Sequence, residues 1–233
     1  MIAGEAKDGL YAQFSRMAKA MSSPRRIELL ELLAQTERSV EELARMTGME
    51  FGNASAQLQV LSRARLVEGR RRGKRILYRL ADQDVTGFLA ALRALSRARL
   101  SEVEAVERAY FQPRDELEPV GCADLLERAE RGEVVVIDVR PREEYEAGHI
   151  PGARCLPLSE LEARLHELPA DAEVVAYCRG PYCVLAPQAV EVLRRAAFRA
   201  RRLAEGFPEW RLAGMPVESE HRPRSLEAAH AAS

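Results

Sequence analysis

Cysteine and histidine are scarce in this chain of 233 residues, which has four of each. The cysteines are Cys122, Cys155, Cys178 and Cys183. So few and scattered, they exclude the disulfide framework of a small secreted domain, and we expect reduced thiols. Residues 1–112 contain neither cysteine nor histidine. Because carboxylates alone bind soft or borderline metals poorly, we predict no metal site, and we also predict no organic cofactor.

Long apolar runs are missing as well. No stretch approaches the roughly 18 apolar residues that cross a bilayer, and the N-terminus lacks the basic-then-apolar layout of a signal peptide. We therefore expect a cytoplasmic protein with no membrane partner. The length is sufficient for two domains that each bury a core of their own.

The formal net charge of −1 conceals an asymmetry between the two halves. Residues 1–112 hold 19 Lys+Arg against 14 Asp+Glu, whereas the remainder holds 16 against 22. Within residues 63–79 there are eight basic residues and one acid, Glu68. Such a local excess of positive charge suits a polyanionic partner.

The first half has the signals of a helix-turn-helix. Ser23 and Pro24 are typical of an N-cap followed by the first position of a helix. Ser39 with Glu42 forms a capping box, and Gly48 predicts the end of that short helix. A second helix follows to about residue 64, and we expect Asn53 to cap it. A short helix, a glycine turn and a second helix make the arrangement expected of a DNA-binding motif.

A β-hairpin is expected directly after this motif. Apolar residues 66–67 and 76–80 flank a basic run, Arg-Arg-Arg-Gly-Lys-Arg, with Gly73 at its tip. The hairpin would project as a charged wing. By itself the run could be an ordinary solvated turn, but its position after a helix-turn-helix favours contact with phosphates.

Together with Ser-Pro-Arg-Arg-Ile at residues 23–27, these features make residues 10–110 resemble the ArsR family of winged-helix repressors. The resemblance implies binding to double-stranded operator DNA. The exposed side of the second helix would face the major groove, where Asn and Gln read adenine edges, and the wing would contact phosphates. The candidate DNA-binding residues are Asn53, Ser55, Gln57, Gln59 and Arg63 on the helix and Arg70, Arg71, Arg72, Lys74 and Arg75 on the wing.

Two amphipathic helices are predicted at the ends of this half. Leu10, Phe14 and Met17 recur at helical spacing. One long helix is expected over residues 84–111, about 40 Å at about 1.5 Å per residue, which is too long for a hundred-residue domain to cover. In the ArsR family the first and last helices form a two-fold dimer, so we predict a homodimer. Metal-sensing cysteines and histidines found in many members are missing here.

A doubly wound α/β domain with a parallel sheet is predicted for the second half, beside a mainly α winged-helix half. Helix 122–131, strand 134–138, strand 174–177 and helix 185–196 alternate along the sequence. The predicted divisions are residues 1–111 for the DNA-binding and dimerisation domain, 112–119 for a linker, 120–219 for the α/β domain and 220–233 for a disordered tail.

The segment most indicative of chemistry is Tyr177–Cys183, which reads Tyr-Cys-Arg-Gly-Pro-Tyr-Cys. Cys178 would lie where a strand ends and a loop turns toward a helix, and successive N–H groups there can form an anion-binding nest. Such a site lowers a thiol pKa from about 8.5 toward about 7 or below. The alternative is that Cys178 is a small buried residue at the end of the sheet.

Cys178 and four further motifs resemble the rhodanese (sulfurtransferase) domain over residues 117–219. The motifs are Asp-Val-Arg at residues 138–140, Glu-Tyr at 144–145, Gly-His-Ile-Pro-Gly-Ala at 148–153, and Gly-Phe-Pro-Glu-Trp at 206–210 followed by Gly-Met-Pro-Val at 214–217. Asp138, Arg140, Glu144 and His149 are expected to form a hydrogen-bonded framework, and Trp210 a core or pocket-rim position.

The resemblance implies that the Cys178 thiolate attacks the outer sulfur of thiosulfate or a persulfide and becomes a transient persulfide. The loop residues expected to support it are Arg179, Gly180, Pro181, Tyr182, Cys183 and Val184, through backbone N–H groups and the Arg179 charge. Valine at 184 excludes the Cys-x5-Arg loop of phosphatases and arsenate reductases. For Cys183 two readings stay open, a packed residue at the start of the helix and a resolving thiol.

We therefore expect a dimeric repressor whose rhodanese domain reacts with sulfane sulfur at Cys178 and senses it, with an acceptor thiol removing the sulfur. One alternative is a sulfurtransferase, in which the winged helix dimerises or localises the enzyme. Another is an inert anion-binding module.

Overall fold

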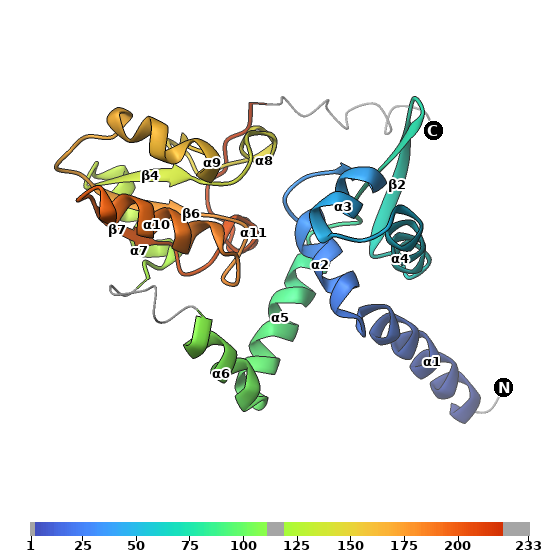
Figure 1. Cartoon of the computed structure of the whole chain (residues 1–233). Coiled ribbons are helices and arrows are strands. Elements are labelled where there is room, and N and C mark those ends of the chain that lie inside the picture. Colours follow the sequence, from blue (N-terminus) through green and yellow to red (C-terminus); the bar gives the residue numbers. More distant parts are fainter. Residues whose placement is uncertain (1–2, 111–118, 221–233) are drawn as a thin grey trace, which may run out of the picture. The chain divides into compact units, whose positions relative to one another are not determined.

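The computed structural model describes residues 3–110 and 119–220 (Figure 1). The chain divides into two compact units, Met1–Gln112 and Pro113–Ser233, and each is described by itself. The predicted linker and tail lie outside the described residues, apart from Pro119 and Glu220. None of the described helices is long and apolar enough to cross a membrane.

The first unit consists of helices around a small antiparallel sheet in the order β1-β3-β2. Its elements are α1 (Ala3–Met21), α2 (Pro24–Leu33), β1 (Arg38–Ser39), α3 (Val40–Thr47), α4 (Phe51–Arg63), β2 (Val67–Arg72), β3 (Arg75–Leu80), α5 (Asp84–Arg99) and α6 (Ser101–Tyr110). The helix-turn-helix is α3 and α4, and the hairpin β2–β3 is the wing. This half therefore has the predicted winged-helix fold.

Local signals account for the helix-turn-helix. The Ser39 side chain accepts a hydrogen bond from the Glu42 N–H, and the Glu42 carboxylate accepts one from the Ser39 N–H at 2.7 Å, which confirms the capping box. Gly48 ends α3 with φ +66°, where glycine carries no Cβ penalty. Asn53 does not cap α4: the helix begins at Phe51, and Asn53 accepts from Gln57 within the first turns.

The wing is a hairpin with a two-residue turn. Arg72 pairs with Arg75, and Gly73 between them has φ +62°. A positive φ at this position is what a tight hairpin turn requires. The predicted tip is confirmed, and the side chains of residues 70–75 are exposed.

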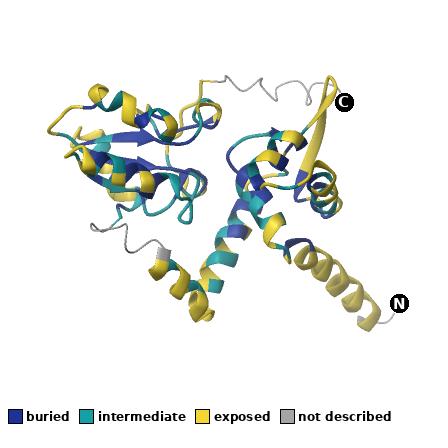
Figure 2. Ribbon diagram, viewed as in Figure 1, coloured by how far each residue is buried: buried dark blue, intermediate teal, exposed yellow. Residues whose placement is uncertain are grey.

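The core of the first unit buries little of helix α1. Leu29, Leu43, Leu58 and Leu61 are fully buried, and the start of α5 packs against them. Residues 4–19 of α1 are all exposed, so only the end of this helix joins the core (Figure 2).

The single long helix predicted over residues 84–111 is wrong. Leu100 is extended (φ −113°, ψ 105°) and separates α5 from α6. Basic residues Arg97 and Arg99 occupy the last turn of α5, and acidic Glu102 and Glu104 occupy the first turn of α6. Each set has the charge that favours its helix end, so the sequence supports two short helices where the apolar pattern indicated one.

The second unit is a parallel four-stranded sheet in the order β5-β4-β6-β7 (Figure 1). Its elements are α7 (Cys122–Glu130), β4 (Val134–Asp138), α8 (Arg142–Ala147), β5 (Arg154–Cys155), α9 (Leu158–Leu161), the 3₁₀ helix η2 (Glu162–Glu167), β6 (Glu173–Tyr177), α10 (Leu185–Arg195), β7 (Arg199–Arg202) and α11 (Phe207–Leu212). The predicted α/β class is confirmed.

Both faces of this sheet are covered. Val174 and Ala176 of β6 pack with α10, whereas Val175 and Tyr177 pack on the opposite side with Trp210 and other residues of α7 and α11. Alternate residues of one strand point to opposite faces, so burial of all four shows a sheet between two helical layers. The carboxyl end of β6 therefore opens at an edge of this sandwich, next to the start of α10.

Candidate functional site

Cys178 follows β6 directly, as expected, but its side chain is not open to solvent. It is 3% exposed, and its sulfur lies 3.8 Å from the carbonyl oxygen of Gly180 and 3.7 Å from that of Cys183. Both contacts suit a protonated thiol, because a thiol donates weakly to carbonyl oxygen. Cys183 is half-exposed on the same loop.

Cys178 and Cys183 titrate as a coupled pair. The pKa of Cys183 is lowered to about 7, chiefly by the side chain of Cys178 beside it and further through the N–H groups of Leu185 and Arg179. Burial raises the pKa of Cys178, and the neighbouring Cys183 raises it further. These shifts belong to the pair of thiols, so the thiolate expected on Cys178 stays a prediction. The two sulfurs form a hydrogen-bonded pair with one acidic proton.

The backbone N–H groups that act on this pair come partly from the predicted loop, residues 179–184, and partly from the helix that follows it. Gly180 and Ala186 act on Cys178, and Arg179 and Leu185 act on Cys183. Leu185 and Ala186 lie in the first turn of α10, beyond the predicted loop. The first N–H groups of a helix have no partner within the helix, so the predicted start of a helix at residue 185 already indicates these two donors. The Cys183 N–H is bonded to the Gly180 carbonyl at 3.1 Å.

Arg179 is held by a buried carboxylate. Its guanidinium bonds to both Glu144 oxygens, with N–O distances of 2.7 to 3.0 Å, and the Glu144 side chain has no exposure to solvent. The expected role of Arg179 in attracting an anionic donor is therefore reduced, because its charge is compensated by Glu144. The pair instead joins the cysteine loop to α8.

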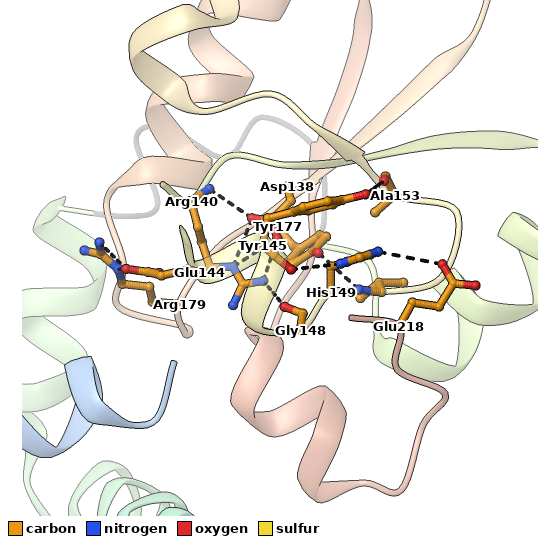
Figure 3. A network of polar contacts seen from close by, with 11 residues as sticks. Asp138, Arg140, Glu144, Tyr145, Gly148, His149, Ala153, Tyr177, Arg179 and Glu218 are labelled. Atoms are coloured by element: carbon orange, nitrogen blue, oxygen red, sulfur yellow. Dashed lines mark hydrogen bonds and ion pairs between the residues drawn. The ribbon is translucent and has the colours of Figure 1, made fainter. Parts of the chain in front are cut away.

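Asp138 and Arg140 form a second buried ion pair, shown with its neighbours in Figure 3. The Arg140 guanidinium lies 2.6 Å from Asp138 Oδ2, donates to the Gly148 carbonyl at 2.7 Å and sits 4.3 Å from the centre of the Phe207 ring. These bonds tie the end of β4 to the turn that precedes residue 150. They are contacts of a structural framework.

His149 and Trp210 also make framework contacts. The His149 ring stacks on Tyr145 with centroids 3.7 Å apart, and its Nδ1 lies 2.8 Å from the Tyr145 carbonyl. Its backbone pairs with that of Glu218. The ring Nε2 also lies 3.7 Å from the Glu218 carboxylate (Figure 3). Trp210 is fully buried and donates through Nε1 to the Pro216 carbonyl at 2.7 Å.

A close approach of two backbone segments positions the cysteine loop. A Cβ atom at Gly206 would lie 2.2 Å from the Gly180 nitrogen, so only glycine fits there. The next residue, Phe207, donates its N–H to the Cys178 carbonyl at 3.0 Å. The remaining loop residues, Pro181, Tyr182 and Val184, are half-exposed, and Val184 is the N-cap of α10.

On α4 the candidate DNA contacts differ in accessibility. Asn53, Gln59 and Arg63 are exposed, whereas Ser55 and Gln57 are half-buried. The Gln57 amide is already bonded, accepting from Arg26 at 2.7 Å and donating to Asn53 at 3.1 Å. The three exposed side chains are therefore the ones best placed to reach a base edge.

Among the predicted wing contacts, Arg70 has an acidic partner. Arg70 forms two hydrogen bonds with the Glu37 carboxylate, and this pairing lowers the pKa of Glu37. Arg71 bonds to the Gly73 carbonyl of its own turn at 3.1 Å. The other predicted contacts, Arg72, Lys74 and Arg75, are exposed around the same tip. Over the described ranges, no three His, Cys, Asp or Glu side chains are grouped to hold a metal ion.

Comparison with known proteins identifies both halves. The family model described as "Bacterial regulatory protein, arsR family" matches residues 23–69, and the "Rhodanese-like domain" model matches residues 122–213. The HTH-type transcriptional regulator Rv0324 of Mycobacterium tuberculosis is 47% identical over 213 residues, which are 91% of this chain and 93% of that protein. A protein named "Sulfurtransferase" from Allochromatium vinosum is 32% identical over 38% of this chain and 82% of its own.

Solved structures match the halves separately. A homodimeric winged helix-turn-helix DNA-binding domain from Mycobacterium bovis is 44% identical and covers 40% of this chain and 87% of that one, with a TM-score of 0.39. A rhodanese-related protein from Thermoplasma volcanium is 26% identical, covers 44% of this chain and 98% of that one, and has a TM-score of 0.40.

Proposed function

Because this chain belongs to the ArsR-type helix-turn-helix transcriptional regulators and carries a rhodanese domain, we propose that it controls transcription in response to sulfane sulfur. The sulfur would be taken up from thiosulfate, a persulfide or polysulfide at the Cys178–Cys183 thiol pair. The observation that carries the proposal is this acidic thiol pair, in a protein whose DNA-binding half contains no cysteine or histidine. The regulatory input then has to come from the other half.

DNA binding is supported by the charge and exposure of α4 and the wing. Arg63 at the end of α4 and the exposed basic residues at the tip of the wing offer guanidinium and ammonium groups to phosphates. Asn53 and Gln59 offer amides to base edges in the major groove. The contacts with phosphates position the protein, and those with bases select the operator.

Dimerisation is supported by an apolar surface that a monomer leaves in water. Leu10 and Phe14 on α1 are 58% and 64% exposed, and Met17 lies one turn further on the same side. Leu95 of α5 is 59% exposed. Apolar residues gathered in this way mark an association surface. A second copy of the chain is the partner we propose, which would present two α4 helices to a palindromic operator.

The sulfur chemistry follows from the thiol pair. Near neutral pH the pair would lose one proton, and transfer of the remaining proton between the two sulfurs would place the charge on either cysteine. Either thiolate attacks the outer sulfur of thiosulfate, forms a persulfide and releases sulfite. The surrounding N–H groups then stabilise the negative outer sulfur.

The test is a titration of DNA with and without donor. A duplex selected from a random pool would be titrated by fluorescence anisotropy before and after treatment of the full-length protein with inorganic polysulfide. We expect polysulfide to change the affinity of the wild-type protein at least about tenfold, a typical coupling between two sites. The double variant Cys178→Ser/Cys183→Ser should bind the duplex without responding. A double variant that responds like the wild type would exclude the thiol pair as the input.

A second candidate function is catalytic sulfur transfer, favoured by the likeness of residues 122–213 to rhodanese-like domains. In that case the winged helix would dimerise or localise an enzyme. Sustained turnover of thiosulfate with an acceptor thiol, together with unchanged DNA affinity after persulfide formation, would favour this function over regulation.

A further inference from the structure

The thiol pair places a second sulfur beside any sulfur atom that the loop accepts. Cys183 packs against the buried cluster that contains Cys178, and the Cys178 sulfur lies 3.7 Å from the Cys183 carbonyl oxygen. The residues between the two cysteines form turns and bends rather than helix or strand. The Cys183 backbone thus lies beside the Cys178 sulfur in a segment that no helix or strand hydrogen bonds hold rigid.

We propose that the loop discharges the sulfur that it accepts: the second thiol displaces it as hydrosulfide, and the loop ends as a Cys178–Cys183 disulfide. This inference rests on the proposed function, because it starts from a persulfide at the thiol pair. It makes a disulfide, and not a stored persulfide, the lasting product of exposure to sulfane sulfur. A disulfide persists after the donor is gone, until a reductant opens it.

The step balances without an added oxidant. A persulfide anion on one cysteine has an inner sulfur attached to Cβ and an outer sulfur that carries the charge. The neighbouring thiol attacks the inner sulfur, the bond between inner and outer sulfur breaks, and a bond between the two cysteines forms. The thiol proton leaves with the outer sulfur as HS⁻. The outer sulfur gains two electrons, and the two cysteine sulfurs lose them.

The balance is the same whichever cysteine first accepts the sulfur. The surroundings of the two sulfurs favour both the attack by the thiol and the departure of the outer sulfur. An attacking thiol reacts best when its pKa is near the ambient pH, and the pair has one pKa of about 7. The N–H groups of Gly180, Leu185 and Ala186 surround the two sulfurs and stabilise negative charge on the leaving one. A lone thiol in the same loop would hold its persulfide until an external thiol removed it.

The experiment follows sulfide and mass together. Full-length protein, reduced and freed of reductant under nitrogen, is treated with thiosulfate, and hydrosulfide is trapped with zinc. Iodoacetamide then blocks remaining thiols before digestion. Trypsin cleaves after Arg179, between the two cysteines, so a disulfide joins two peptides that are otherwise separate. Cys122 and Cys155 serve as internal standards, because burial raises the pKa of both and they lie outside the loop.

For the wild-type protein we expect about one hydrosulfide per chain and a peptide pair joined through Cys178 and Cys183, with Cys122 and Cys155 still alkylated. Neither Cys178→Ser nor Cys183→Ser should release hydrosulfide, and any sulfur that they accept should remain as a persulfide. Cys155→Ser should behave like the wild type. Protein kept without donor should show no joined peptides.

Two results would overturn the inference and leave the proposed function standing. One is a wild-type chain that stays one sulfur atom heavier and releases no hydrosulfide. The other is a single-serine variant that releases as much hydrosulfide as the wild type. If neither thiosulfate nor polysulfide changes the mass of any chain, the proposed function itself fails, and this inference fails with it.

Discussion

Replacing Cys178 with alanine removes the thiol whose hydrogen bond is the main reason for the lowered pKa of Cys183. In the wild-type protein that pKa is about 7, so roughly half of Cys183 is thiolate at pH 7. Without the donor we expect the pKa to return toward the ordinary value of about 8.5, at which about 3% is thiolate. Because the thiolate is the reactive form, alkylation of Cys183 at pH 7 should slow about 15-fold.

The measurement is the rate of iodoacetamide labelling of the Cys183 peptide from about pH 5 to about pH 10, read by mass spectrometry. The wild type should show an inflection near pH 7, and Cys178→Ala should show one more than a unit higher. Cys155 is the standard in the same digest, since its raised pKa keeps it slow at neutral pH in both proteins. An inflection near pH 7 in both proteins would refute the argument that the Cys178 thiol acidifies its neighbour.

Three further substitutions test the surroundings of the site and the dimer. Gly206→Ala places a methyl group against the cysteine loop, so we expect the free energy of unfolding in urea to fall by about 2 kcal/mol and thiol labelling to slow. The control Gly121→Ala should change little, because a methyl group there meets open space. Glu144→Gln removes the negative charge that faces the partly buried Arg179 guanidinium, and the free energy of unfolding should fall by about 3 kcal/mol. The control Glu143→Gln, at an exposed position, should leave that free energy nearly unchanged. Phe14→Asp should weaken self-association about tenfold or more in analytical ultracentrifugation while the helical circular dichroism is kept.

Elements with local signals were predictable from the sequence. The Ser39–Glu42 capping box, the Gly73 turn and the apolar strand 134–138 each depend on residues close together in the chain, and all three are in the structure. The apolar periodicity continues across Leu100 and predicts one helix, whereas the charges at the end of α5 and the start of α6 favour two. Asparagine is common at the N-cap position of helices, which predicts a cap at Asn53. The helix α4 instead begins two residues earlier, at Phe51.

The order of residues alone is enough to predict that two cysteines, five positions apart, follow a buried strand and precede a helix. How each thiol is buried and what surrounds it follow from the fold. Cys178 is enclosed between the sheet and α10, which raises its pKa, whereas the pKa of Cys183 is lowered by the side chain of Cys178 and by backbone N–H groups. Likewise the partner of Arg179 is Glu144, 35 positions earlier in the chain. A pKa depends on burial and on neighbouring charges, and both are supplied by segments that meet only when the chain folds.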